Sequence, residues 1–221
     1  WDHAAMAAIY AALGDLNGTK AQRRGAGDAG AVAALEGHKD AEALVLLSVA
    51  LLGAGRDHVA VADAANRGLA ACPQQALAHR VLGMVHLQGA RWQVAADVFA
   101  RAIALAPADA ECHHRLGVAQ LGLHAAADAA TAFAAALALD PTLDDAAVGL
   151  GRARLAQRDH MGAMAALVTL ARRTPPRADA LFFLAAAEEA NGDTEAARRD
   201  FCASAAAGYS HAELKCPSHK R

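Results

Sequence analysis

Histidine and cysteine are the residues of this chain that could hold a metal ion or carry redox chemistry. The 221 residues include eleven histidines and four cysteines. Cys112, His113 and His114 are consecutive, so on a helix their side chains point about 100° apart and cannot meet at one ion. No two cysteines form a C-x-x-C pair, and no ligand pair has a usual zinc spacing. We therefore expect neither a metal site nor a redox motif.

A glycine-rich stretch has the form of a nucleotide-binding motif. Gly25 to Gly30 read G-x-G-x-x-G, but the dinucleotide fingerprint requires a strand before it and a helix after it. The preceding TKAQRR has no strand pattern, so we expect a flexible, basic loop. The chain has no G-x-S-x-G, H-E-x-x-H or P-loop motif. Glu188 and Glu189 are adjacent and are expected on a solvated helix face, so the sequence predicts neither an enzyme nor a cofactor.

Composition and charge bound the class of partner and the compartment. The formal net charge is −2 and the pI about 6.6, so no basic field favours nucleic acid. The longest uncharged apolar run, 43–55, is shorter than the ~20 residues that span a bilayer. Cys72, Cys112, Cys202 and Cys216 are expected as unpaired thiols, which fits a reducing compartment. We therefore predict a cytoplasmic location, with the periplasm as the alternative if a targeting segment preceded Trp1.

The elements that must position these residues follow a repeat. Prolines recur every 34 residues, at Pro73, Pro107, Pro141 and Pro175. The same interval separates a small row (Ala95, Ala129, Ala163, Ala197), a large row (Phe99, Phe133, Leu167, Phe201) and a glycine row (Gly83, Gly117, Gly151). Apolar residues recur at steps of three and four, which predicts two amphipathic helices in each repeat. We expect the glycine row where two helix backbones approach closely.

These patterns set the helix bounds. The expected helices span 42–53, 58–71, 76–88, 92–105, 110–122, 126–139, 144–156, 160–172, 178–190 and 194–207. Proline ends the second helix of each pair because it lacks the backbone donor and clashes with the preceding turn. Asp57, Asp159 and Asp193 stand at the expected N-cap of the second helix.

The order Leu-Gly, Ala, Phe, Ala, Pro over 34 residues resembles the tetratricopeptide repeat. The resemblance implies an all-α fold, a right-handed α-solenoid of about five helix-turn-helix repeats at 42–75, 76–109, 110–143, 144–177 and 178–211. Residues 1–41 would add an N-terminal helix and the Gly-rich basic loop, as a degenerate repeat or a cap. Residues 212–221 would be a polar, frayed tail. The first repeat departs from the pattern, with Ala65 and Gly68 at places where Phe and Ala are usual.

The resemblance also implies a binding surface, because first helices of such repeats line a concave groove. The expected peptide-binding residues are Leu46, Arg80, Met84, Leu87, His114, Arg115, Val118, Leu121, Val148, Arg152, Leu155 and Phe182. This mixture of apolar side chains and cations suits an apolar or amphipathic, partly acidic peptide. The Lys and Asn clamp that some family members use for a terminal carboxylate is absent. His79 and His113 lie one repeat apart, and a zinc ion shared between them is the weaker alternative to packing or surface roles.

The favoured interpretation is a protein-interaction scaffold or adaptor without catalytic activity. It would bind a protein or peptide, possess no transmembrane segment, and serve as a chaperone or assembly factor of a bacterial secretion, pilus or envelope system. One alternative is the repeat arm of a larger enzyme, such as a transferase, that presents substrates to a catalytic domain outside this chain. The other is a scaffold that forms homo-oligomers through its repeat ends.

Overall fold

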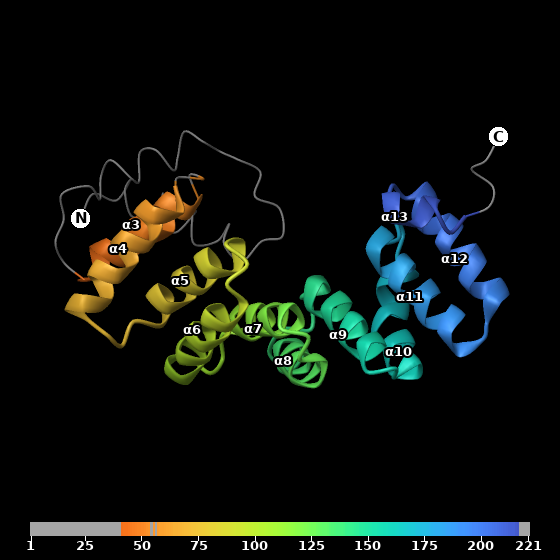
Figure 1. Ribbon diagram of the computed structural model, residues 1–221, viewed down its shortest axis with the longest axis horizontal. Coiled ribbons are helices and arrows are strands. Elements are labelled where there is room, and N and C mark those ends of the chain that lie inside the picture. The colour runs from red at the N-terminus through yellow and green to blue at the C-terminus, as the bar shows by residue number, and fades with distance from the viewer. Residues whose placement is uncertain (1–40, 54, 56, 217–221) are drawn as a thin grey trace. The chain divides into compact units, whose positions relative to one another are not determined.

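The computed structural model describes residues 41–53, 55 and 57–216 (Figure 1). Predictions for residues 1–40 and 217–221 lie outside these. The described residues fold into helices without a strand: α3 (Ala41–Gly53), α4 (His58–Ala71), α5 (Ala76–Gln88), α6 (Trp92–Leu105), α7 (Ala110–Gly122), α8 (Ala126–Leu139), α9 (Asp144–Ala156), α10 (His160–Ala171), α11 (Ala178–Asn191), α12 (Thr194–Ala206) and α13 (Ser210–Glu213). The all-α prediction is confirmed, and no expected helix differs by more than one residue at either end.

The chain divides into two compact units inside α7. The N-terminal unit ends at Ala119 and the C-terminal unit begins at Gln120. In the first unit α3 packs on α4, α4 on α5, and α5 on α6. In the second unit α8 packs on α9, α9 on α10, α10 on α11, α11 on α12, and α9 also meets α11. Helices that are consecutive in sequence are therefore packing partners within each unit.

The turn inside each helix pair repeats with the 34-residue interval. The residues at equivalent places all have positive φ: Ala90 (53°), His124 (59°), Arg158 (63°) and Gly192 (97°). Side chains other than glycine are strained there, so this turn geometry is imposed by the helices on either side. The expected caps are confirmed for Asp57, which accepts from the N–H of Val59, and for Asp159, which accepts from that of Gly162. Asp193 also occupies the N-cap of α12, but its carboxylate makes no capping bond and instead accepts from Asn191.

Glycines lie where helices approach too closely for a side chain. A Cβ built on Gly83 of α5 would lie 2.6 Å from Cζ of Phe99 in α6. On Gly151 of α9 it would lie 2.5 Å from Cγ of Leu167 in α10. The expected close approach is therefore confirmed at these two pairs. Gly68 explains the irregular first repeat, because its Cβ would lie 2.7 Å from Cγ2 of Val45.

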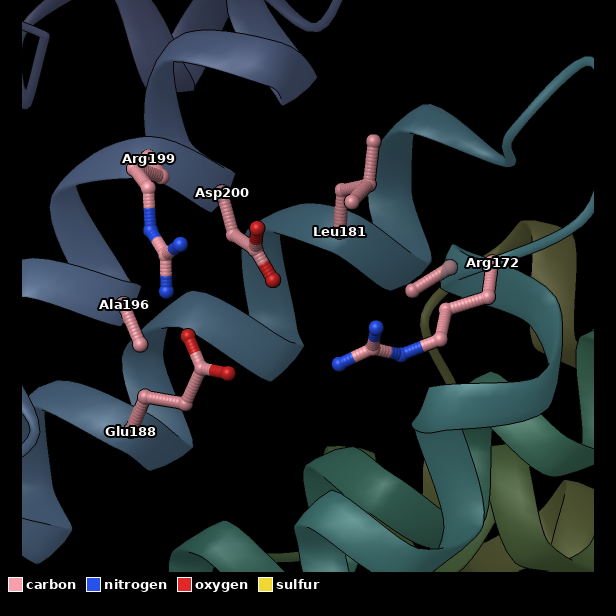
Figure 2. Close-up of a pocket in the computed structure, with 7 residues that line it drawn as sticks. Arg172, Leu181, Glu188, Ala196, Arg199 and Asp200 are labelled. Atoms are coloured by element: carbon pink, nitrogen blue, oxygen red, sulfur yellow. The ribbon is translucent and has the colours of Figure 1, made fainter.

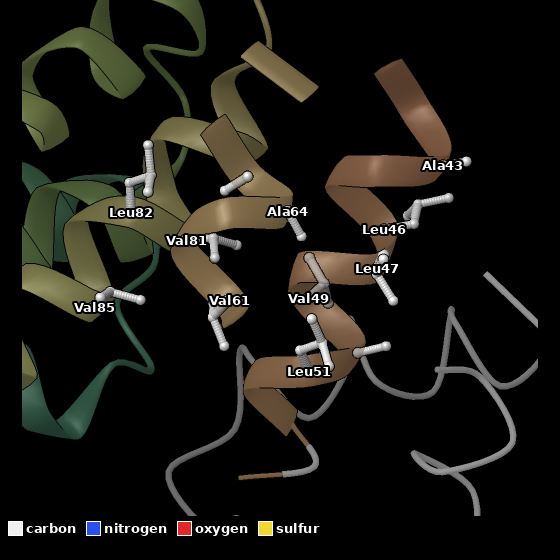
Figure 3. Close-up of a cluster of buried hydrophobic side chains, with 12 residues drawn as sticks. Ala43, Leu46, Leu47, Val49, Leu51, Val61, Ala64, Val81, Leu82 and Val85 are labelled. Atoms are coloured by element: carbon white, nitrogen blue, oxygen red, sulfur yellow. The ribbon is translucent and has the colours of Figure 1, made fainter. Parts of the chain in front are cut away.

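Apolar clusters fill the space between the helices. In the N-terminal unit, one cluster joins α3, α4 and α5 through Val49, Val61 and Val81 (Figure 3). A second cluster surrounds Phe99, which is fully buried with Ala95, Ala102 and Cys112. The C-terminal unit has its own clusters, around Leu167, Phe201 and Ala212. The large row of the repeat thus forms the interior of each unit, as its spacing indicates.

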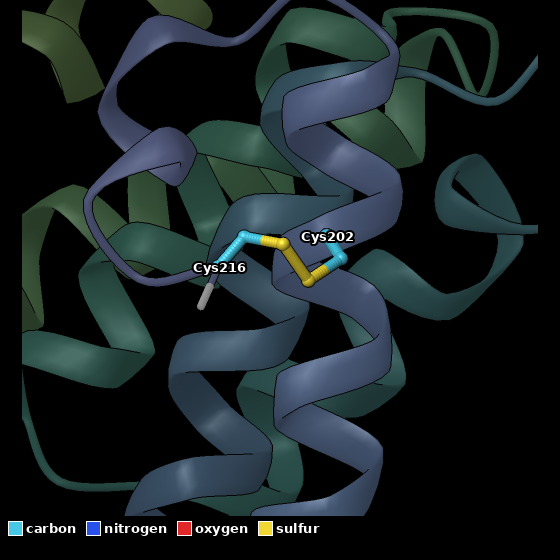
Figure 4. Close-up of a disulfide and its surroundings, with 2 residues drawn as sticks. All are labelled: Cys202 and Cys216. Carbon is cyan, nitrogen blue, oxygen red and sulfur yellow. A yellow bond between two sulfur atoms is a disulfide. The ribbon is translucent and has the colours of Figure 1, made fainter. Parts of the chain in front are cut away.

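The C-terminal end differs from the sequence-based prediction. Of the expected frayed tail, residues 212–216 are described: α13 (Ser210–Glu213) reaches into this segment, and Cys216 makes a disulfide with Cys202 of α12 (Figure 4). Gly208, with a φ of 93°, lets the chain turn back after α12, and Ala212 is fully buried. The prediction of four unpaired thiols is therefore wrong for these two. Cys72 and Cys112 are free, and burial together with Asp109 raises the pKa of the Cys112 thiol.

Candidate functional site

Four of the expected peptide-binding residues lie in the interior instead of on a surface. Leu46, Arg80, His114 and Val148 are all less than a tenth exposed. Leu46 belongs to the cluster of α3, α4 and α5, and Val148 packs with Leu167 and Leu181. A helical face that is read from sequence alone does not show which of its residues neighbouring helices cover. These four positions are corrected from peptide contacts to structural residues.

Arg80 illustrates why a charged side chain can be buried here. Its Nη1 donates to Oδ2 of Asp109 over 3.1 Å. Asp109 precedes α7 and its other oxygen accepts from the backbone N–H of Cys112, also over 3.1 Å. The guanidinium therefore links α5 to the start of α7 instead of meeting a ligand. A buried charge persists when it is paired in this way.

His114 and Arg115 lie around Glu111 in a second polar group on α7. Nδ1 of His114 lies 3.6 Å from Oε2 of Glu111, and Nε of Arg115 donates to Oε1 over 2.5 Å. Burial raises the pKa of Glu111, but its interactions with His114 and Arg115 outweigh that effect and lower the pKa below its usual value. The Glu111 carboxylate is therefore held ionised between the imidazole of His114 and the guanidinium of Arg115. Of the two, only Arg115 is partly exposed.

His79 and His113 have equivalent structural roles. Nε2 of His79 lies 3.2 Å from the carbonyl oxygen of Pro73, and Nε2 of His113 lies 3.0 Å from that of Pro107. A carbonyl only accepts, so Nε2 carries the proton in each bond. One ring nitrogen of each histidine is thus engaged with the carbonyl oxygen of a repeat proline. Among the described residues, no group of three or more His, Cys, Asp or Glu side chains could hold a metal ion.

The other expected groove residues retain some exposure. Arg152 is exposed, and the half-buried ones are Met84, Leu87, Arg115, Val118, Leu121, Leu155 and Phe182. In the N-terminal unit, Met84 and Leu87 pack against the cluster that contains Phe99 and Cys112. In the C-terminal unit, the Phe182 ring contacts those of Phe201 and Tyr209, with centroids 5.4 and 5.0 Å apart. Part of each apolar side chain therefore supports the fold.

A contact between α9 and α11 carries the clearest surface chemistry. The guanidinium carbon of Arg152 lies 5.4 Å from the centroid of the Phe183 ring. Leu155 follows Arg152 by three residues on α9, so the two side chains share a helix face. We call Arg152, Leu155 and Phe183 the α9–α11 patch. Phe183 was not among the expected site residues, although an aromatic side chain stands there at a place where other repeats have Leu47, Val81, Arg115 and Gly149.

Two further sequence-based expectations concern a membrane-spanning helix and the adjacent residues Glu188 and Glu189. No helix in the described part of the chain is both long and apolar enough to cross a membrane. Glu188, expected on a solvated face, is only 6% exposed because α10 and α12 flank it, whereas Glu189 is exposed and pairs with Lys215. The prediction for this glutamate pair is therefore wrong for Glu188.

Comparisons with known proteins agree with this architecture. Solved structures with a similar fold include YrrB (17% identity, TM-score 0.71, covering 83% of this chain and 93% of that one) and PilF of Pseudomonas aeruginosa (18%, 0.71, 96% of each). MamA is similar as well, at 20% identity and a TM-score of 0.67, with 82% of this chain and 96% of that one covered. No curated protein matches the sequence.

The amino-acid sequence also matches the model of a protein family. The model described as Tetratricopeptide repeat matches residues 77–144 and 148–213, which together make up more than half of the chain. The matched segments contain the glycine row, the large row, three of the four repeat prolines (Pro107, Pro141 and Pro175) and the helix pairs from α5 to α12. The chain therefore belongs to the tetratricopeptide repeat family and has the architecture of a protein–protein interaction scaffold.

Proposed function

We propose that this chain is an adaptor that binds an apolar or amphipathic, partly acidic peptide segment of a partner protein. The observation that carries the proposal is the α9–α11 patch, in which an exposed arginine lies over a half-buried phenylalanine ring. No ion pair of Arg152 is found among the described residues, so its charge can serve a ligand. A partner carboxylate would meet Arg152, and apolar side chains would meet Leu155 and Phe183.

The energetics of such a site favour a mixed ligand. A cation over an aromatic face at an exposed site contributes about 0.5–1 kcal/mol and holds both side chains in place. An arginine held in one orientation pays less entropy when it forms a charge-assisted hydrogen bond with a carboxylate. Apolar area removed from water around Leu155 and Phe183 then adds about 25 cal/mol per Å². Neither the bond between Arg152 and a carboxylate nor the burial of apolar area is specific for one peptide by itself. Together they favour a peptide in which an acidic residue stands beside an apolar one.

The N-terminal unit offers related chemistry on its own first helices. Met84 and Leu87 of α5 are half-buried, and so are Arg115 and Val118 of α7. Arg115 is already paired with Glu111, so we assign an apolar role to this surface and the acidic contact to Arg152. Leu121, at the end of α7, belongs to the C-terminal unit; it is also half-buried and remains a proposed apolar contact of that unit.

The wider role that we propose is a chaperone or assembly factor of a bacterial secretion, pilus or envelope system. YrrB, similar in fold, is described as a TPR protein with an unusual peptide-binding site. The Cys202–Cys216 disulfide favours an oxidising compartment over the cytoplasm, and so favours the periplasmic alternative. End-to-end self-association needs an uncovered terminal repeat; α13 packs on α12 at this end, which argues against association there.

A selection followed by affinity measurement tests the α9–α11 patch. Peptides that bind the chain would be selected from a random library, and the affinity of one synthetic peptide measured by fluorescence polarisation. Arg152→Glu should weaken binding at least about tenfold, which corresponds to ~1.4 kcal/mol, and Phe183→Ala should weaken it as well. Arg198→Glu is the matched control, because Arg198 is exposed in the same unit on the second helix α12. Equal affinities for the Arg152 and Arg198 variants would refute this location.

A further inference from the structure

A polar cavity lies between α10, α11 and α12, apart from the α9–α11 patch. It has a volume of about 230 Å³ and is bounded by Leu181 and Ala196 and by four charged side chains, those of Arg172, Glu188, Arg199 and Asp200. Figure 2 shows both carboxylates and both guanidinium groups directed toward a common space. We call this cavity the α10–α12 pocket. An apolar cavity of about 150 Å³ holds a benzene molecule, so the pocket can admit a short side chain.

Glu188 is the unusual member of this group. Its side chain is 6% exposed, and Oε2 is excluded from solvent without a hydrogen-bond partner among the described residues. Burial raises the pKa of Glu188, and the charges of Asp200 and Asp193 raise it further against the opposing effect of Arg172 and Arg199. A buried acceptor of this kind is costly to leave unpaired. Oε2 of Glu188 is therefore a buried acceptor at the pocket that has no donor among the described residues.

Arg172 and Arg199, the two arginines of the pocket lining, are exposed to solvent, unlike Glu188. Arg172 is the C-cap residue of α10, and Arg199 lies on α12. Neither forms an ion pair with Glu188 or Asp200 in the part of the chain that the structure describes. Burial raises the pKa of Asp200 despite the lowering effect of both arginines. The pocket lining thus carries one buried carboxylate, one half-buried carboxylate and two exposed guanidinium groups.

We propose that the α10–α12 pocket binds the ammonium group of a lysine side chain from a protein partner. Oε2 of Glu188 accepts from the ammonium, and Leu181 and Ala196 line the lysine methylenes. The exposed guanidinium groups of Arg172 and Arg199 attract an acidic residue next to the lysine and repel a further positive charge. This arrangement favours a lysine flanked by acidic residues over a polyamine, which carries several ammonium groups. The site is independent of the proposed peptide patch, because it involves different residues and the second helices α10 and α12.

Titration of the chain with short probes tests this site. The probe is a capped tripeptide, acetyl-Asp-Lys-Asp-amide, and binding is followed by backbone amide shifts in two-dimensional NMR. We expect shifts at α11 and α12 with a Kd of about 1 mM or tighter. The same tripeptide with norleucine in place of lysine should bind at least tenfold more weakly, and so should spermidine. Equal binding of the norleucine probe, or tighter binding of spermidine, would overturn the proposal.

Charge-neutral variants locate the ammonium contact. Glu188→Gln keeps the shape of the side chain but removes its charge, and should weaken the lysine probe about tenfold. Glu195→Gln is the matched control, because Glu195 is an exposed carboxylate on α12; it should leave the Kd unchanged within twofold. Far-UV circular dichroism checks that both variants fold. A folded Glu188→Gln variant with wild-type affinity, or the absence of shifts at α11 and α12, would refute the assignment.

Discussion

The contact between Gly83 and Phe99 gives a quantitative test of the helix packing. Gly83→Ala would place a methyl carbon 2.6 Å from Cζ of Phe99, whereas carbon atoms pack at about 3.5–4.0 Å. The ring must therefore retreat by roughly 1 Å. Because Phe99 is fully buried, that movement disturbs α5 and α6 together, and overpacking of this kind costs about 1–3 kcal/mol. Alanine recovers about 1 kcal/mol through its higher helix propensity. We expect a net loss of about 1 kcal/mol.

Urea unfolding followed by circular dichroism measures this change, with Gly89→Ala as the matched control. The nearest atom to a Cβ on Gly89 is 3.5 Å away, which is ordinary contact, so this variant should gain about 0.4–1 kcal/mol from a less flexible unfolded chain. Combining Gly83→Ala with Phe99→Leu removes ring atoms that clash, and should reveal a coupling of about 0.5–3 kcal/mol. If Gly83→Ala stabilises the chain as Gly89→Ala does, the close approach of α5 and α6 is refuted.

Four further perturbations test the turns, the core, the disulfide and the buried carboxyl. Ala129→Leu, at a fully buried site, should cost about 1–3 kcal/mol in thermal unfolding, whereas Ala127→Leu, at an exposed one, should stay within about 0.5 kcal/mol; equal effects would contradict the packing register. Ala90→Gly should raise the urea midpoint, because glycine adopts the positive φ of 53° without strain; an unchanged or lower midpoint would argue against strain there. Cys202→Ser opens a disulfide loop of 14 residues and should cost about 3 kcal/mol, seen as faster hydrogen exchange in α13; unchanged exchange would show that packing alone holds this segment. Burial raises the pKa of Glu188, so its carboxyl favours the fold while protonated and loses that contribution as the pH rises through the folded-state pKa. Glu188→Gln should therefore raise the melting temperature at pH 7 and lose that advantage below about pH 4; a gain that persists at low pH would contradict this assignment.

Local patterns were sufficient to predict the helices and part of their packing. Proline and the three- and four-residue apolar steps act within a single helix pair, so the bounds of α4 to α9 could be predicted from the chain alone. The 34-residue interval also predicted a close helix approach at the glycine row, which the structure shows where Gly83 meets Phe99 and Gly151 meets Leu167. The same patterns could not show which helix faces the neighbouring helices would cover, so residues such as Leu46 and Val148 were expected on a surface although they are buried.

Features that join non-equivalent positions were missed for a physical reason. The Arg80–Asp109 pair spans 29 residues, and the Cys202–Cys216 disulfide spans 14. Neither separation matches the repeat, so aligning one repeat on the next gives no signal for either contact. The disulfide also depends on the turn at Gly208 and on α13, which have no counterpart in the preceding repeats. These contacts follow only from the folded arrangement of the helices.

The three arginines predicted for peptide binding have different roles, and only one of them has no carboxylate partner among the described residues. Arg80 is engaged by Asp109, and Arg115 by Glu111, within the N-terminal unit. To bind a partner carboxylate, either arginine would have to give up an existing carboxylate, so the net gain would be small. Arg152 has no such competitor among the described residues, and the contact with Phe183 orients it without neutralising it. An acidic residue of the partner should therefore be recognised on α9, and the apolar residues beside it should determine which acidic peptides bind.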